Sequence, residues 1–186
     1  TLTCTTYSGS TSIGSKSITV KLNLPASVVP TITSLTATRV DGDVPSAWGI
    51  YVQTKSKAAL SVNGAAGSYG SAIASYSITG GGFAGTSDTM TTGFLNTAGT
   101  ITFTATVTDS RGRTSAAKTV SISVASYSAP SFSSYLSQRC SSSGTLASDG
   151  TYIKASVSYS YSSCSGKNSV TRATYYRRIG ATSWTN

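Results

Sequence analysis

Apolar and polar residues alternate along several short stretches of this chain. The alternation is clearest at 18–24, 58–62, 101–107 and 120–124. A period of two places the apolar side chains of a stretch on one face of a β-strand. No stretch keeps a period of 3.6 residues. We therefore expect an all-β fold of aligned sheets, including a strand over 18–24 whose inner face is Ile18, Val20, Leu22 and Leu24.

Turn signals separate these stretches. Asn63-Gly64 follows the 58–62 stretch and predicts a hairpin, because such turns need positive φ at both positions. Gly80-Gly81-Gly82 predicts a break after an apolar segment. In the segment 109–113, Asp109 favours an Asx turn and Gly112 a left-handed conformation, which predicts a tight loop.

The sequence repeats at a spacing of about 100 residues. TVSISV at 119–124 repeats TVKLNL at 19–24, and the matched positions continue through Pro30 with Pro130 and Arg39 with Arg139. One further residue of shift aligns Gly150-Thr151-Tyr152-Ile153 with Gly49-Ile50-Tyr51-Val52. A period of this length matches a β-sandwich of roughly 100 residues.

The repeat predicts three segments of a tandem array. Residues 1–30 are expected to be the C-terminal strands of a first unit, 31–130 a complete β-sandwich, and 131–186 the N-terminal part of a third unit. Short proline-containing linkers at 25–30 and 128–130 join them, since proline fixes φ and cannot donate to a sheet ladder. Linkers of this kind are stiffer than Gly/Ser tethers. We read the chain as a piece of something longer.

Composition excludes several classes of function. The chain has no histidine and no glutamate, which removes a Ser-His-Asp triad, a histidine zinc site and a glutamate-dependent glycosidase. Asp41 and Asp43 fit a turn better than a calcium loop, which needs six to eight oxygen ligands. No run approaches the roughly 18 apolar residues of a membrane span. We expect a soluble protein without catalysis, cofactor, metal or membrane partner.

The three cysteines do not form a disulfide framework. Cys4 and Cys140 occupy positions typical of small core residues, and Cys164 lies in an expected loop. A bridge between Cys140 and Cys164 stays open as an alternative.

Candidate ligand-binding residues are few. The net charge of +9 is spread along the chain, so we expect no nucleic acid partner, although Lys167, Arg172, Arg177 and Arg178 stand near Tyr175-Tyr176. Attraction to anionic cell-wall polymers such as teichoic acids stays open. The candidates are Tyr69, Arg111 and Arg113 in loops, and Trp48 near a strand end. Aromatic stacking on sugars and inter-domain packing are both open for such aromatic residues.

The stretches 25–62, 92–130 and 139–170 resemble tail-associated minor structural proteins of siphophages and related prophages of Gram-positive bacteria. The resemblance rests on the combination of YVQTKSK, VTDSRGRTSAAKTV and YSAP. It implies tandem immunoglobulin-like β-sandwiches, a structural role without catalysis, other tail subunits as partners, and a place in the virion, hence extracellular after release.

The function we expect is that of an extended spacer in a phage tail tip or fibre arm, which presents host-attachment regions. Three alternatives stay open. The sandwiches themselves bind host cell-wall glycans as an adhesin, or the chain belongs to a bacterial surface adhesin. In the third, the chain is a filament subunit, in which the N-terminal strands of one copy complete the C-terminal unit of the next. A homo-oligomer is expected in a tail assembly.

Overall fold

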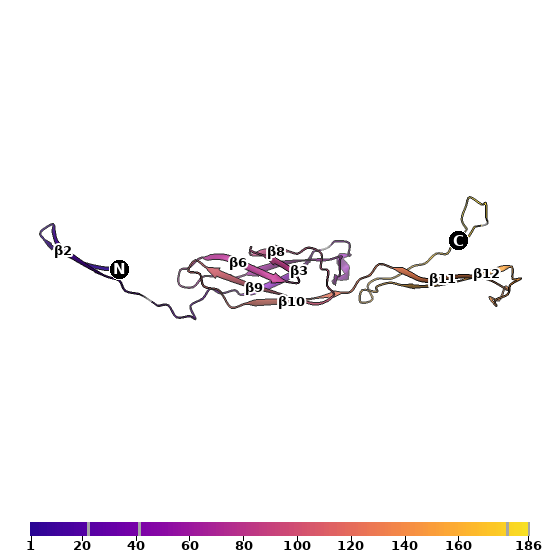
Figure 1. Cartoon of the computed structure of the whole chain (residues 1–186), viewed down its shortest axis with the longest axis horizontal. Coiled ribbons are helices and arrows are strands. Elements are labelled where there is room, and N and C mark those ends of the chain that lie inside the picture. The colour runs from indigo at the N-terminus through magenta and orange to yellow at the C-terminus, as the bar shows by residue number, and fades with distance from the viewer. Residues whose placement is uncertain (22, 41, 178, 186) are drawn as a thin grey trace.

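The computed structural model describes residues 1–21, 23–40, 42–177 and 179–185, so Leu22, Asp41 and Arg178 lie outside the described residues. Figure 1 shows a central body with a two-stranded hairpin at either end. The described residues form strands and one short 3₁₀ helix, which confirms an all-β fold. The elements are β1 (Leu2–Ser8), β2 (Thr11–Ile18), β3 (Ser34–Val40), η1 (Ser46–Trp48), β4 (Tyr51–Val52), β5 (Lys57–Asn63), β6 (Ile73–Gly80), β7 (Phe83–Gly85), β8 (Thr89–Thr91), β9 (Gly99–Asp109), β10 (Lys118–Ala125), β11 (Ser131–Cys140) and β12 (Tyr152–Ser160).

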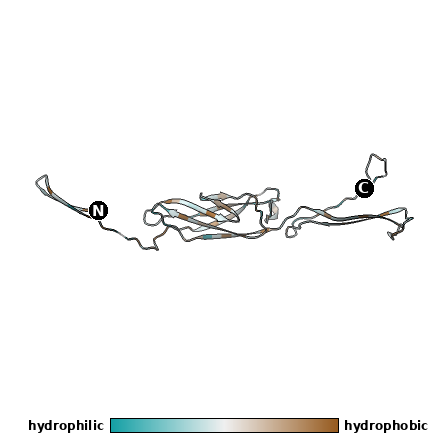
Figure 2. Cartoon of the chain, in the orientation of Figure 1, coloured by the Kyte–Doolittle hydropathy of each residue, from teal (hydrophilic) through white to brown (hydrophobic). Residues whose placement is uncertain are grey.

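The central body spans residues 31–127 apart from Asp41 and consists of two sheets. One has the strand order β4-β10-β9-β6-β7 and the other β3-β5-β8. Their facing sides share one core, built from inward residues of both sheets, and Figure 2 shows apolar positions alternating with polar ones along these strands. The fully or nearly buried members include Leu60, Ile78, Leu95, Phe103, Ala105 and Val107.

The alternation predicted from sequence sets the registers in this core. β10 pairs antiparallel with β9, with Val120 opposite Phe103 and Ile122 opposite Ile101. Partners directly opposite each other point to the same face. The two strands therefore present one continuous apolar surface to the facing sheet, and the expected strands in 58–62, 101–107 and 120–124 are confirmed.

The turn predictions gave mixed results. Gly80 pairs with Phe83, and Gly81 and Gly82 have φ of 57° and 81°, so the glycine run makes the tight β6–β7 turn. The hairpin predicted at Asn63-Gly64 is wrong. β5 pairs with β3 and β8, and the chain after Gly64 crosses to the other sheet. The Asn63 side chain instead donates to the Thr36 hydroxyl at 3.1 Å, which ties it to the neighbouring strand.

The N-terminal hairpin joins β1 and β2, with Leu2 opposite Ile18. The strand predicted over 18–24 is wrong. β2 ends at Ile18, and residues 19–21, 23 and 24 are outside any strand. The β1·β2 ladder ends at the pair of Leu2 with Ile18, and Val20 and Leu24 are both exposed. The core position expected for Cys4 is also wrong, since Cys4 is exposed.

The C-terminal hairpin joins β11 and β12, with Cys140 opposite Tyr152 and Arg139 opposite Ile153. In the central body Val40 stands opposite Lys57 in the same way. Tyr152 therefore corresponds to Lys57 and not to Tyr51, and the predicted alignment of 150–153 with 49–52 is wrong. The cause is the shorter connection between β11 and β12. Several large apolar side chains of this hairpin are exposed: Phe132, Tyr135, Leu136 and Ile153.

Candidate functional site

Three of the four candidate residues meet at one end of the central body. The guanidinium of Arg111 donates to the carbonyl oxygens of Ser68 and Tyr69 at 2.8 and 2.9 Å. Tyr69 stands at the tip of its loop with φ of 48°, and 83% of it is exposed. Arg111 is thus an internal brace that holds the 67–72 loop, with its donors already directed at protein carbonyls.

Asp109 organises the second loop at this end. Its Oδ1 accepts hydrogen bonds from the backbone N–H groups of Arg113 at 2.9 Å and Arg111 at 3.0 Å. Gly112, with φ of 76°, closes the turn onto the Asp109 carbonyl at 2.8 Å. The predicted tight loop is therefore confirmed. The backbone donor of Arg113, followed by the Ser71 hydroxyl and the backbone donor of Arg111, holds the pKa of Asp109 below its usual value despite its burial.

Arg113 faces inward. Its Nε lies 3.9 Å from Oδ2 of Asp109, and its side chain is only 20% exposed. A cation placed this way neutralises a buried carboxylate and has little surface left for a ligand. Sequence reasoning proposed Arg113 as a ligand contact and missed the burial of Asp109. The Asx turn predicted at Asp109 was the sequence signal that could have indicated this burial.

We expect Arg111→Ala to loosen the 67–72 loop without unfolding the central body. Hydrogen bonds from charged donors contribute about 1.5 kcal/mol or more, and solvent screening reduces this at an exposed site. Chymotrypsin cleavage after Tyr69 should then accelerate severalfold, up to about tenfold. The matched control is Arg172→Ala at another exposed arginine, which should leave the cleavage rate unchanged. An unaltered rate in Arg111→Ala would contradict the bracing role.

Trp48 lies at the opposite end of the central body, away from the other three candidates. Val44, Val52 and Cys164 are buried there together, and Trp48, Ile50 and Tyr127 pack against them. We call these six residues the joint cluster, because Cys164 comes from the loop after β12 and the other five belong to the central body. The structure thus gives Trp48 a packing contact between the central body and the C-terminal segment.

The cysteines carry no bridge. Cys4, Cys140 and Cys164 are all free, and the last two are buried. The core position expected for Cys140 is confirmed, with 3% exposed. Burial raises the pKa of the Cys164 thiol, since the thiolate would lose its hydration.

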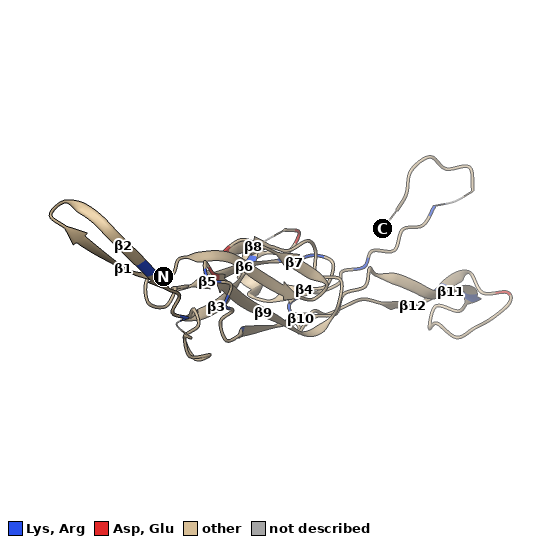
Figure 3. Ribbon diagram, turned by 60° about the vertical axis from the view of Figure 1, so that its left-hand side comes forward, with Lys and Arg blue, Asp and Glu red and all other residues tan. Residues whose placement is uncertain are grey.

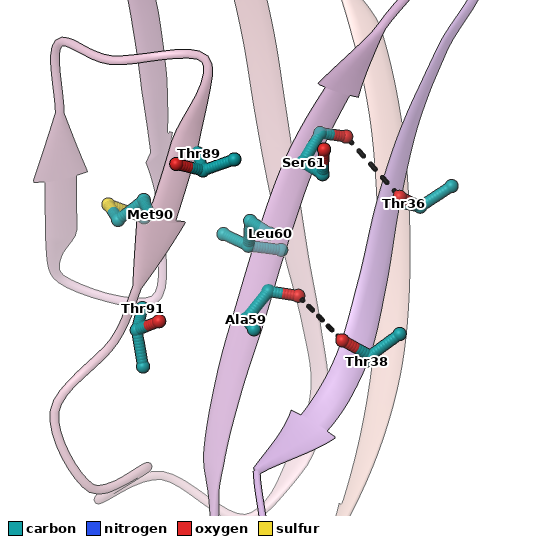
Figure 4. Close-up of a pocket in the computed structure, with 8 residues that line it drawn as sticks. All are labelled: Thr36, Thr38, Ala59, Leu60, Ser61, Thr89, Met90 and Thr91. Atoms are coloured by element: carbon teal, nitrogen blue, oxygen red, sulfur yellow. Dashed lines mark hydrogen bonds between the residues drawn. The ribbon is translucent and has the colours of Figure 1, made fainter.

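A shallow hollow lies on the outer face of the β3·β5·β8 sheet (Figure 4). Its volume is about 250 Å³, below the roughly 300–1,000 Å³ of small-molecule sites. Two of its hydroxyls already serve the sheet: Thr36 donates to the Ser61 carbonyl and Thr38 to that of Ala59. The hollow is lined by Thr36, Thr38, Ala59, Leu60, Ser61, Thr89, Met90 and Thr91.

Charged residues are dispersed over all three parts of the chain (Figure 3). Several cations have individual partners: Lys55 pairs with Asp43 at 3.2 Å, Lys57 lies over the Phe94 ring, and Arg177 over the Trp184 ring. Within the described residues, no three His, Cys, Asp or Glu side chains gather in a way that could hold a metal ion. In the same part of the chain, no helix is long and apolar enough to cross a membrane.

These features define an elongated all-β protein whose prominent loop arginines are used in internal contacts. The family model for "Siphovirus protein of unknown function (DUF859)" matches residues 1–157, and the chain belongs to this family of siphovirus proteins. A comparison with curated proteins gave no match. The expected siphophage origin is confirmed, and a place in the tail stays a prediction.

Proposed function

We propose that this protein is a non-enzymatic structural component of a siphophage tail, in which it acts as an extended spacer in the tail tip or fibre arm. The observation that carries the proposal is the linear arrangement of the three parts (Figure 1), together with a buried contact where the second meets the third. Sheets joined by dense backbone ladders resist extension and proteolysis. A series of such bodies sets the length and the stiffness of the spacer.

The finer architecture belongs to the same proposal. The two-sheet central body is an immunoglobulin-like β-sandwich, and the end hairpins are parts of further units of that kind, joined by short proline-containing segments. The antiparallel pairs β3·β5 and β11·β12 support this interpretation, because Val40 and Cys140, which the repeat aligns, each pair with the first residue of the second strand. Other tail subunits are its partners, and the assembled form is a homo-oligomer, as is usual for tail components.

Immunoelectron microscopy tests the place in the virion. Antibodies raised against the 1–186 chain should decorate the tail of the siphovirus that carries this protein, with label at the tip or along a fibre. Preimmune serum on the same particles is the control. Label confined to the capsid, or virions without label when the lysate contains the protein, would overturn the proposal.

One observation favours a second function, the binding of host cell-wall glycans. Tyr69 presents an exposed ring at a loop tip, and aromatic rings stack on sugars. We expect the spacer to show no saturable binding to purified Gram-positive cell walls once salt screens its positive charge. Saturable binding that survives salt and is lost in Tyr69→Gly would instead make the protein an adhesin.

A further inference from the structure

The hairpin of β11 and β12 has one apolar face. Residues directly opposite each other in an antiparallel pair point to the same side of the sheet, and so do alternate residues along a strand. Phe132 stands opposite Tyr159. Tyr135 stands opposite Val157, and Ile153 lies four residues before Val157 on β12. All five side chains therefore share one side of the hairpin, which we call the open face because each of them is exposed.

The corresponding face of the central body is covered. The repeat aligns β11, from residue 134 onward, with β3. Over this length each strand pairs with its partner strand, β12 or β5, without a register shift, because the shift in β11·β12 lies before residue 134. Tyr135 and its partner Val157 therefore take the places of a buried pair in the central body. That pair is Leu35 with Val62, which are 5% and 8% exposed because the second sheet packs on them.

One strand of that second sheet has a sequence copy elsewhere in the chain. β10 lies against β3, and its Ile122 and Val124 are buried in the shared core. The segment 19–24 repeats residues 119–124 of β10. The described residues of 19–24 are outside any strand, and Val20 and Leu24 are exposed. The chain thus carries an uncovered platform and, in a separate place, a segment with the pattern of a covering strand.

The two surfaces belong to different ends of the molecule. Figure 1 shows the N-terminal hairpin and the β11·β12 hairpin on opposite sides of the central body. This extended arrangement keeps the surfaces apart within one copy, whereas two copies can bring them together. Aromatic side chains contribute about 150–250 Å² each when covered. The three on the open face, with Ile153 and Val157, provide roughly 600 Å² per partner, which is at the low end of specific interfaces.

We propose that the open face binds residues 1–24 of a second copy of this chain, with 19–24 placed on β11 as β10 lies on β3. Each copy then offers one surface and fills another, which builds an open head-to-tail filament. The inference rests on the homo-oligomeric form in the proposed function and adds the contact that forms it. Immunolabelling tests the place in the virion and the experiment below tests this contact, so either can fail without the other.

Two variants that each lose one surface provide the test. The first, Val20→Thr with Leu24→Thr, removes apolar area from the 19–24 segment. The second, Tyr135→Thr with Ile153→Thr, removes it from the open face and keeps strand propensity. Either pair of changes should weaken self-association about hundredfold. Each variant alone should therefore sediment as a monomer up to about 100 μM, where the wild-type 1–186 chain forms oligomers whose mass rises with concentration.

Mixing the variants makes the result specific. Each keeps the surface that the other has lost, so an equal mixture should form one-to-one dimers. The matched control, Leu136→Thr with Tyr152→Thr, changes exposed side chains on the opposite face of the hairpin and should oligomerise like the wild type. Because all the changed side chains are exposed, every variant should keep the wild-type melting temperature. A monomeric wild type, a mixture of folded variants that stays monomeric, or dimers formed by the first variant alone would overturn the proposal.

Discussion

Replacing Phe103 with alanine is expected to lower the free energy of unfolding of the central body by about 3–5 kcal/mol. The ring is fully buried between the two sheets. Removal of a large buried ring loses its transfer free energy and leaves a cavity that rigid strands refill only in part. A Cβ added at Gly80 would lie 2.9 Å from this ring, so the neighbouring strand is already in close contact with it.

Urea denaturation of the 1–186 chain with Trp184→Phe in the background, followed by the fluorescence of the remaining Trp48, measures this effect. The matched control is Phe132→Ala on β11, where the same residue type is 81% exposed. A surface substitution of this kind should change stability by less than about 0.5 kcal/mol. Equal costs for the two variants would mean that the core of the central body is not where the stability of the chain resides.

The contrast between Phe103 and Phe132 shows how far the sequence determines the fold. Alternation alone predicted the β9 and β10 strands correctly, because the two strands pair with each other and their apolar faces pack in the core of the central body. The same kind of alternation predicted a strand over 18–24, which is not present. An apolar period of two reports that a segment can form a strand. Pairing also requires a neighbour in register, and that information is not local.

The candidate site shows the same limit. Asp109 and Gly112 form a turn within five residues, so local turn chemistry predicted it. The contact of Arg111 with Tyr69 spans 42 residues of sequence and depends on the pairing of β6 with β9, which places Ile73 opposite Asp109. Sequence reasoning chose both residues as candidates for ligand binding and had no means to see that they contact each other.

Asp109→Asn is expected to destabilise the central body at neutral pH and to remove part of its acid sensitivity. The carboxylate accepts two backbone N–H groups and lies beside the buried guanidinium of Arg113. An amide at this position loses the charge and leaves the guanidinium without its counterion, which is costly in a buried setting. The direct consequence should be a lower melting temperature at pH 7.

The sign of the pH dependence follows from the pKa of Asp109, which is lower in the folded protein than its ordinary value. The unfolded chain therefore takes up the proton first on acidification, at about pH 4. The stability contributed by the ionised group is fully present above that pH and is lost as the pH falls toward the lower folded pKa. The melting temperature of the wild type should thus fall toward that of Asp109→Asn between about pH 5 and pH 3. Asp88→Asn, at an exposed carboxylate, is the matched control and should follow the wild type throughout. A constant difference between wild type and Asp109→Asn across this range would show that the Asp109 charge does not stabilise the loop that carries Arg111.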